Sequence, residues 1–211
     1  MIDERLEKLR ASLKDPDPNV RNAAAQALEK LEGVQNIGQL VEILKTGRID
    51  QKLKAVYGLA KIPGVETLRI LVKCLRHPME EVRGSTLRAL GERRDPRIYP
   101  AIVERLEDPN EGIRLLAVDT IAKLKDRSFT PSLLKIVHHT NAEVAARALH
   151  AVGLIGDSEA EQTILSLLGH PNSRIREAAA EALGNLETAS AVAAAPEAAA
   201  VGPPRRAAQG R

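Results

Sequence analysis

The chain has 211 residues, 28% charged side chains and a formal net charge of +3, a length that suits one ordinary domain or one repeat array. Tryptophan is absent, and Tyr57, Tyr99 and Phe129 are the only aromatic residues, which disfavours a compact core built on large rings. A single cysteine, Cys74, excludes an intramolecular disulfide, and no apolar run is long enough to cross a bilayer. The charged segment 1–5 lacks the apolar run of a signal peptide, so we expect a cytoplasmic protein without a membrane contact.

The sequence pI of about 9.1 is basic, but the excess charge is concentrated at one end. Residues 188–211 contain Glu197, Arg205, Arg206 and Arg211 and carry +2 of the total of +3, which leaves +1 for residues 1–187. Nucleic-acid-binding domains usually show strong, clustered positive charge. The nearly balanced body therefore disfavours nucleic acid as the partner.

Similar segments recur along the chain from its beginning. The segment DPDPNVRNAAAQALEKL starts at Asp15, and its copies start at His77 (HPMEEVRGSTLRALGER), Asp108 (DPNEGIRLLAVDTIAKL) and His170 (HPNSRIREAAAEALGNL). The β-branched residue before the arginine lies at Val20, Val82, Ile113 and Ile175, and Gln51 and Val144 hold the same position in the two repeats where Lys52 and Ala145 replace the arginine. Successive positions are 31 residues apart without an insertion. Self-similarity at a fixed period predicts six repeats over residues 3–187.

Each repeat is predicted to contain two helices. Counted from Val20 as position zero, the small residues at +4 and the apolar residues at +8 and +11 share one helix face with position zero. The helix before it has apolar residues four apart, at Leu9 and Leu13, Leu40 and Leu44, Leu71 and Leu75, Ile102 and Leu106, Leu133 and Val137, and Ile164 and Leu168. We therefore expect an all-α fold, a right-handed α-solenoid of six stacked 31-residue helical hairpins with twelve helices.

Helix boundaries are marked by capping residues. Asp17, Asn110, Asn141 and Asn172 are expected to cap the second helices, and Asp95, Asp126 and Asp157 the first helices of the following repeats. The arginine after each anchor recurs as Arg21, Arg83, Arg114 and Arg176. We expect these arginines to bind a turn carbonyl or an aspartate, with anion binding as the alternative.

Residues 188–211 form a second region. They contain three prolines and two glycines and no periodic large apolar residue. Such a segment cannot bury a core, so we expect a repeat domain over 1–187 and a disordered Ala/Pro/Arg tail over 188–211, with a short frayed helix before Pro196 at most.

The repeat unit DPDPNVRNAAAQALEKL and its copies resemble the short HEAT repeat of the phycobilisome-lyase type over residues 3–187. The resemblance implies a solenoid whose second helices line the concave surface. Members of this group include bilin lyase subunits, adaptors in bacterial signalling, and a hydroxylase that holds two iron ions through adjacent His-Glu pairs. This chain contains no His-Glu pair.

No cofactor or metal is expected. Among the five histidines, His77, His139 and His170 occupy the turn position that Asp15 and Asp108 hold in other repeats, so their spacing reflects the repeat and not a ligand set. Catalytic and phosphate-binding motifs are missing from the sequence. Cys74 is interpreted as a small buried side chain, with a reactive thiol as the alternative.

The candidate binding residues lie on the second helices. Position +6 reads Gln26, Tyr57, Arg88, Asp119, His150 and Glu181, and it changes chemical type in every repeat, unlike the core positions. The predicted binding set on the concave face is Leu53, Tyr57, Arg88, Leu115, Asp119 and His150. The alternative is that Arg88 and Asp119 pair across repeats and the leucines pack between hairpins.

A second, basic candidate is the turn with Arg93, Arg94 and Arg97, matched one repeat later by Lys123, Lys125 and Arg127. It is interpreted either as a solvated loop or as a contact for phosphate or an acidic partner.

Three functions follow from these features. The first is a non-catalytic, monomeric scaffold or adaptor that binds a protein partner on the concave face. The second is a lyase-like enzyme or enzyme subunit of the bilin-lyase type, which the resemblance implies. The third, nucleic-acid binding through the basic turns, is disfavoured by the balanced charge.

Overall fold

A computed structural model describes the backbone of residues 2–198 and the side chains of residues 4–28, 31–33 and 35–186. All regular elements within the described backbone are helical, and it contains no strand. The chain divides into two compact units, Met1–Ala101 and Ile102–Arg211, and the boundary falls inside the short helix α6 (Tyr99–Val103).

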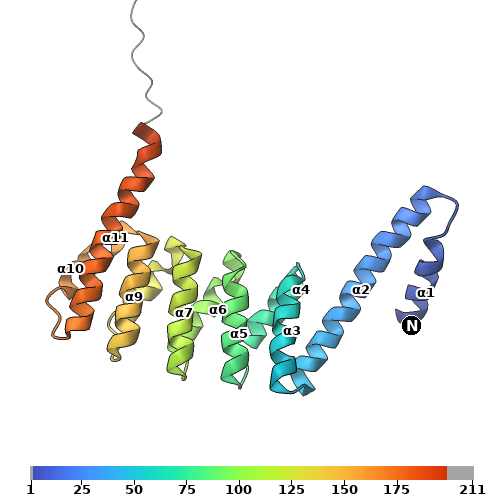
Figure 1. The fold of residues 1–211 in the computed structure, drawn as a ribbon, viewed down its shortest axis with the longest axis horizontal. Helices are drawn as coiled ribbons and strands as arrows, with labels where there is room; N and C mark the ends of the chain where they lie inside the picture. The colour runs from blue at the N-terminus through green and yellow to red at the C-terminus, as the bar shows by residue number, and fades with distance from the viewer. Residues whose placement is uncertain (1, 199–211) are drawn as a thin grey trace, which may run out of the picture. The chain divides into compact units, whose positions relative to one another are not determined.

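Unit 1 contains α1 (Ile2–Ser12), α2 (Pro18–Thr46), α3 (Ile49–Lys61), α4 (Val65–Cys74), α5 (Glu80–Gly91) and the 3-10 turn η1 (Pro96–Ile98). Helix α1 packs against α2, and α2 packs against α3. Helices α3 and α5 lie side by side, and α4 contacts both of them (Figure 1). These are stacked helical hairpins, as the repeat predicts.

Unit 2 contains η2 (Glu104–Glu107), α7 (Glu111–Leu124), η3 (Arg127–Phe129), α8 (Thr130–Ile136), α9 (Ala142–Ile155), η4 (Ser158–Ala160), α10 (Glu161–Leu167) and α11 (Ser173–Ala198). The second helices α7, α9 and α11 are successive neighbours, while α8 packs against α9 and α10 against α11 (Figure 1). The α-solenoid class is confirmed.

Most of the predicted core positions of the second helices are buried, but Val20 at position zero of the first repeat is exposed, and Leu28 and Leu183 at position +8 are half-buried. At position +4, Ala55, Thr86, Ala117, Ala148 and Ala179 are all nearly inaccessible to solvent. At position +8, full burial is found for Leu59, Leu90, Ile121 and Val152. The helix face predicted from the spacing is therefore the face that packs against neighbouring helices.

The expected helix break between the first two repeats is absent. Helix α2 runs without interruption for 29 residues, so the prediction of twelve separate helices was wrong at this junction. In the later repeats, the corresponding position is Gly64, which follows Pro63 and has a φ of 134°, or a capping aspartate such as Asp95. The first junction has Gly33 at this position, without a proline or a capping side chain, and nothing there ends the helix.

The capping predictions are confirmed. Side-chain oxygens of Asp17, Asn110, Asn141 and Asn172 accept hydrogen bonds from backbone N–H groups of the second helices, at 2.7 to 3.1 Å. Those of Asp95, Asp126 and Asp157 cap the 3-10 turns that open the following repeats.

The turn inside four of the six hairpins is held by the recurring arginine, as predicted, and the fifth repeat has Ala145 at this position. Arg83 Nη1 donates to the carbonyl oxygens of His77 and Pro78, at 2.9 and 3.0 Å. The same pair of bonds is made by Arg21, Arg114 and Arg176 in their own repeats. Lys52 replaces the arginine in the second repeat and donates to the carbonyls of Leu44 and Lys45.

The turn histidines perform the role of the aspartate that they replace. Nδ1 of His77, His139 and His170 accepts a hydrogen bond from the N–H group two residues later, as Oδ1 of Asp15 does. Burial and the charge of Lys52 lower the pKa of His77, which keeps its ring neutral and able to accept at neutral pH. The interpretation of these histidines as part of the repeat is confirmed.

The C-terminal helix extends beyond the predicted end of the repeat domain. Helix α11 continues to Ala198, so residues 188–198 have a helical backbone and Glu187 is not a helix end. Residues 199–211 of the predicted tail lie outside the described residues.

We expect Gly153→Ala to destabilise unit 2, because a Cβ at this position would lie 2.8 Å from the Cα of Ala182. Separating α9 from α11 to admit it should cost about 1–3 kcal/mol of unfolding free energy. Gly184→Ala is the matched control, since Gly184 occupies the same position one repeat later and has nothing within 4 Å of such a Cβ. Thermal unfolding followed by circular dichroism measures both variants, and an unchanged Tm for Gly153→Ala would contradict the close packing.

We name the arginines that donate to the turn carbonyls the arginine clamps. Their contribution to the free energy of unfolding should depend on how deeply each one is buried. Arg83 is only 7% exposed, so Arg83→Met leaves two carbonyls without their charged donor and should cost about 2 kcal/mol. Arg21 makes the same bonds in an exposed setting, where water can replace it, so Arg21→Met should cost less than about 1 kcal/mol. Urea denaturation of the two variants gives the comparison, and equal losses would show that burial does not decide the strength of the clamp.

Candidate functional site

The six side chains at position +6 are all exposed, in contrast to the buried positions +4 and +8. We name this row, Gln26, Tyr57, Arg88, Asp119, His150 and Glu181, the second-helix face. Tyr57 is 45% exposed, an unusual setting for one of only three aromatic residues. The flanking residues Leu53 and Leu115 are half-buried and do not form an exposed apolar border.

The predicted binding residues are divided between the two units. Unit 1 holds Leu53 and Tyr57 on α3 and Arg88 on the adjacent helix α5. Unit 2 holds Leu115 and Asp119 on α7 and His150 on the adjacent helix α9. Each half of the set is thus brought onto neighbouring helices of its own unit.

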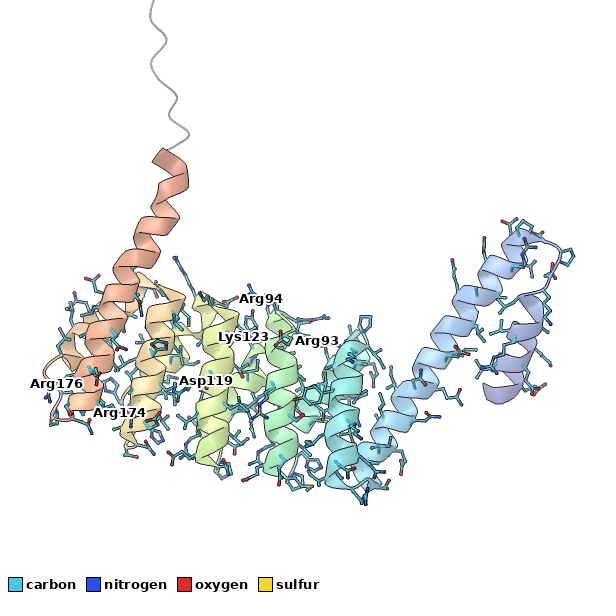
Figure 2. All side chains as sticks on the ribbon, viewed as in Figure 1. Arg93, Arg94, Asp119, Lys123, Arg174 and Arg176 are labelled. Carbon is cyan, nitrogen blue, oxygen red and sulfur yellow. The ribbon has the colours of Figure 1, made fainter. Side chains whose placement is uncertain are left out.

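A chain of ion pairs connects the three second helices of unit 2. Asp119 on α7 accepts from Arg147 on α9 at 3.1 Å, and Arg147 also bonds to Glu143 at 3.3 Å. Glu143 in turn pairs with Arg174 at the start of α11 (Figure 2). The hydrogen bond to Glu143 and the charge of Asp119 raise the pKa of Arg147. Asp119 therefore already has a cationic partner, supplied by Arg147.

A hollow of about 420 Å³ lies between α9 and α11. It is lined by Glu143, Ala146, Arg147, His150, Arg174, Glu177, Ala178 and Glu181. Both arginines in this lining are paired with carboxylates, whereas no ion pair is recorded for Glu177 or Glu181 within the described part of the chain. The hollow therefore offers His150 and two glutamates one helical turn apart to a ligand.

Sequence reasoning missed Glu143, Arg147, Arg174 and Glu177. A signal was present, because Glu143 and Arg174 are 31 residues apart and occupy the same position in consecutive repeats. When consecutive hairpins stack, residues at the same repeat position lie next to each other, so opposite charges at that position can pair. The pair could thus have been found by comparing charges at every position of the repeat.

The basic turn at the end of α5 is largely structural. The Arg93 guanidinium donates to the carbonyl oxygens of Leu59, Ala60 and Ile62, which closes the C-terminal end of α3. Arg97 binds Asp95 at 2.6 Å, and this bond lowers the pKa of Asp95 to about 2. Arg94 is exposed beside a hollow of about 450 Å³ (Figure 2). Of the three predicted contact residues, Arg93 thus has a structural role within unit 1.

Cys74 has the environment predicted for it. The side chain is buried, and burial raises the pKa of the thiol to about 11. It is therefore protonated at neutral pH and a poor nucleophile, which confirms its interpretation as a small core residue.

Among the side chains of residues 4–28, 31–33 and 35–186, no group of three or more His, Cys, Asp or Glu is arranged to hold a metal ion. Among the described helices, none combines the length and the apolar character needed to span a membrane.

Family comparison agrees with the observed repeats. The model for HEAT repeats matches residues 68–139 and 130–209, and the model for a single HEAT repeat matches residues 6–32. These matches extend over more than half of the sequence, and the chain belongs to the HEAT repeat family. No curated protein matches it.

Solved structures show the same fold. The complex of CpcE and CpcF of phycocyanin lyase from Nostoc sp. PCC7120 is similar with a TM-score of 0.57 and 24% identity, over 72% of this chain and 65% of that one. This chain therefore spans about two thirds of the length of the lyase chain. The Escherichia coli protein YibA has a TM-score of 0.52 and 19% identity, over 88% of this chain and 69% of that one. At these identities, the likeness shows the fold alone.

We expect Arg93 and Arg94, the two adjacent arginines of the basic turn, to contribute very differently to the free energy of unfolding. Arg93→Ala removes a charged donor from the carbonyls that end α3 and should cost about 2 kcal/mol of unfolding free energy. Arg94→Ala, on an exposed side chain, should change stability by less than about 0.5 kcal/mol. Chemical denaturation distinguishes them, and a silent Arg93→Ala would return Arg93 to the candidate contact residues.

Proposed function

We propose that the chain is a non-catalytic scaffold or adaptor that binds a protein partner on its second-helix face. The observation that supports this most is the contrast between different positions of the second helix, compared over all repeats. Positions +4 and +8 keep small or apolar side chains, with Thr86 as the one hydroxyl, and are buried in most repeats, whereas position +6 is exposed and presents Tyr57, Arg88, Asp119, His150 and Glu181 in turn. Asp119 pairs with Arg147 across the stack, and the stacking does not require the other side chains of this set.

The individual residues support a protein partner. Tyrosine and arginine are the residue types most enriched among interface hot spots, and Tyr57 and Arg88 lie on neighbouring helices of unit 1. In unit 2, the hollow beside His150 supplies a recess into which a partner side chain can enter. HEAT-like repeats commonly mediate protein binding, and the similar lyase structure is itself a complex of two proteins.

The partner can be trapped by placing photo-crosslinking benzoylphenylalanine at position 57 or at position 150. Leu168 on the segment after α10 is the control position, because it is exposed and lies outside the second-helix face. We expect one protein to be captured from positions 57 and 150 and not from position 168.

The captured protein, once purified, should bind more weakly to the variants Tyr57→Ala, Arg88→Ala and His150→Ala. Each should weaken binding at least about tenfold, or about 1.4 kcal/mol, with an unchanged Tm because the three side chains are exposed. Leu168→Ala should bind normally, and light scattering should show that the free chain is a monomer. Three silent substitutions on the second-helix face would contradict the proposal.

The bilin-lyase alternative rests on the fold resemblance and can be tested directly. Incubation of the chain with phycocyanobilin and an unmodified phycocyanin subunit would yield a covalent, coloured product if the chain had this activity on its own. We expect no product.

A further inference from the structure

The turn between α4 and α5 is built around His77, and its hydrogen bonds depend on the charge of that ring. Nδ1 of His77 accepts from the backbone N–H group of Met79 at 3.1 Å. An imidazole ring that carries a proton on both nitrogens has no acceptor left. Protonation of His77 therefore removes this bond and sets two N–H groups against each other.

Two cations act on the same ring, from the helices on either side of the turn. Burial lowers the pKa of His77, and the charges of Lys52 on α3 and Arg83 on α5 lower it further. Lys52 is 8% exposed and Arg83 is 7% exposed, so water screens their charges poorly. Arg83 is held at this place by its hydrogen bonds to the carbonyl oxygens of His77 and Pro78. A proton on His77 is therefore a third positive charge within one buried turn.

The other titratable groups near the turn do not compensate this charge. Cys74 at the end of α4 is protonated and neutral, because burial raises the pKa of its thiol to about 11. Arg76 and Glu80, on either side of the turn, are exposed and opposite in charge. Among the described side chains, the charges that act on the pKa of His77 are both positive.

The repeat does not require a titratable base at this position. In the first and fourth repeats, Asp15 and Asp108 accept the same backbone hydrogen bond, at 2.9 and 3.0 Å. A carboxylate remains an acceptor down to about pH 4, and it attracts neighbouring cations. The third repeat thus has a histidine where a residue used elsewhere in the chain would keep the turn closed in weak acid.

His77 also differs from the other turn histidines in the cations beside it. Its two neighbours, Lys52 and Arg83, hold the position after the anchor in its own hairpin and in the hairpin before it. The fifth repeat has Ala145 at this position. One of the two cations is therefore missing for the turn histidines of the fifth and the sixth repeat.

We propose that the turn between α4 and α5 is an acid-sensitive switch in unit 1. In weak acid, His77 takes up a proton from the solvent, loses the hydrogen bond from Met79 and repels Lys52 and Arg83. The turn then opens, and α5 packs less tightly on α3. These two helices carry Arg88 and Tyr57, but the switch does not depend on the proposed function, because it acts on the fold itself.

The lowered pKa of His77 sets the pH range in which the turn opens. The ordinary pKa of a histidine is 6.5, so the unfolded chain takes up the proton at a higher pH than the folded chain does. The stability that the neutral ring contributes is therefore complete above about pH 7.5 and is lost as the pH falls below about 6.5.

Cys74, the single cysteine of the chain, reports the opening. Its side chain is buried, and its carbonyl oxygen accepts the N–H group of His77 at 3.1 Å. The full chain is labelled with dithiodipyridine, which reacts with thiols in weak acid, and each rate is divided by the rate for the urea-unfolded chain at the same pH. We expect this ratio to rise at least about tenfold from about pH 7.5 to about pH 5.5, with unchanged far-UV circular dichroism.

Variants of the chain assign the effect to His77. His77→Asn and His77→Asp both supply an oxygen acceptor for the N–H group two residues later, and neither takes up a proton in this pH range. For both, the labelling ratio should stay within about twofold between the two pH values. His139→Asn is the matched control, because His139 in unit 2 accepts the same kind of bond. This variant should keep the full rise.

Three results would overturn the proposal. The first is an equal labelling ratio of the unmodified chain at both pH values. The second is the same rise in His77→Asn and His77→Asp as in the unmodified chain, which would assign the opening to another group. The third is the loss of the rise in His139→Asn, which would show that acid acts on the stack as a whole and not on the turn of the third repeat.

Discussion

The close approach of successive second helices is the constraint on which the rest of the structure depends. A single hairpin cannot bury its apolar face, and the buried alanines at position +4 allow the next hairpin to cover it. Between α9 and α11 the distance is so short that only a glycine fits at position 153. The register that buries Ala148 and Ala179 also exposes His150 and Glu181.

Six of the 31 lysine and arginine side chains hold turns or a helix end of the fold. Four arginines and Lys52 bind turn carbonyls, and Arg93 closes the end of α3. A basic pI therefore says little about the chemistry of the surface in this protein. The clamp recurs in five of the six repeats, and the fifth has Ala145 at this position, whereas the structural contact of Arg93 occurs once.

The two recesses differ in the ligand chemistry that they offer. The hollow between α9 and α11 in unit 2 is polar, and its arginines are already neutralised by carboxylates. A hollow of about 600 Å³ along α4 in unit 1 combines apolar lining residues with cations, among which Arg69 pairs with Glu66 and Arg97 with Asp95. Such a difference within one HEAT repeat chain arises because the stacking requires only some positions of each repeat and leaves the remaining positions free to diverge.

The sequence by itself determined the helical hairpins, their buried columns, the caps and the arginine clamps, since each depends on contacts within one repeat or between identical neighbours. Only the tertiary structure decided that α2 is continuous, because a missing cap permits a helix to continue but does not require it to. Tertiary contacts also decided that Arg93 reaches the end of α3 and that Asp119 pairs with Arg147. The reach of a long side chain across a stack depends on the distance between helices, and side-chain volumes in three dimensions set that distance.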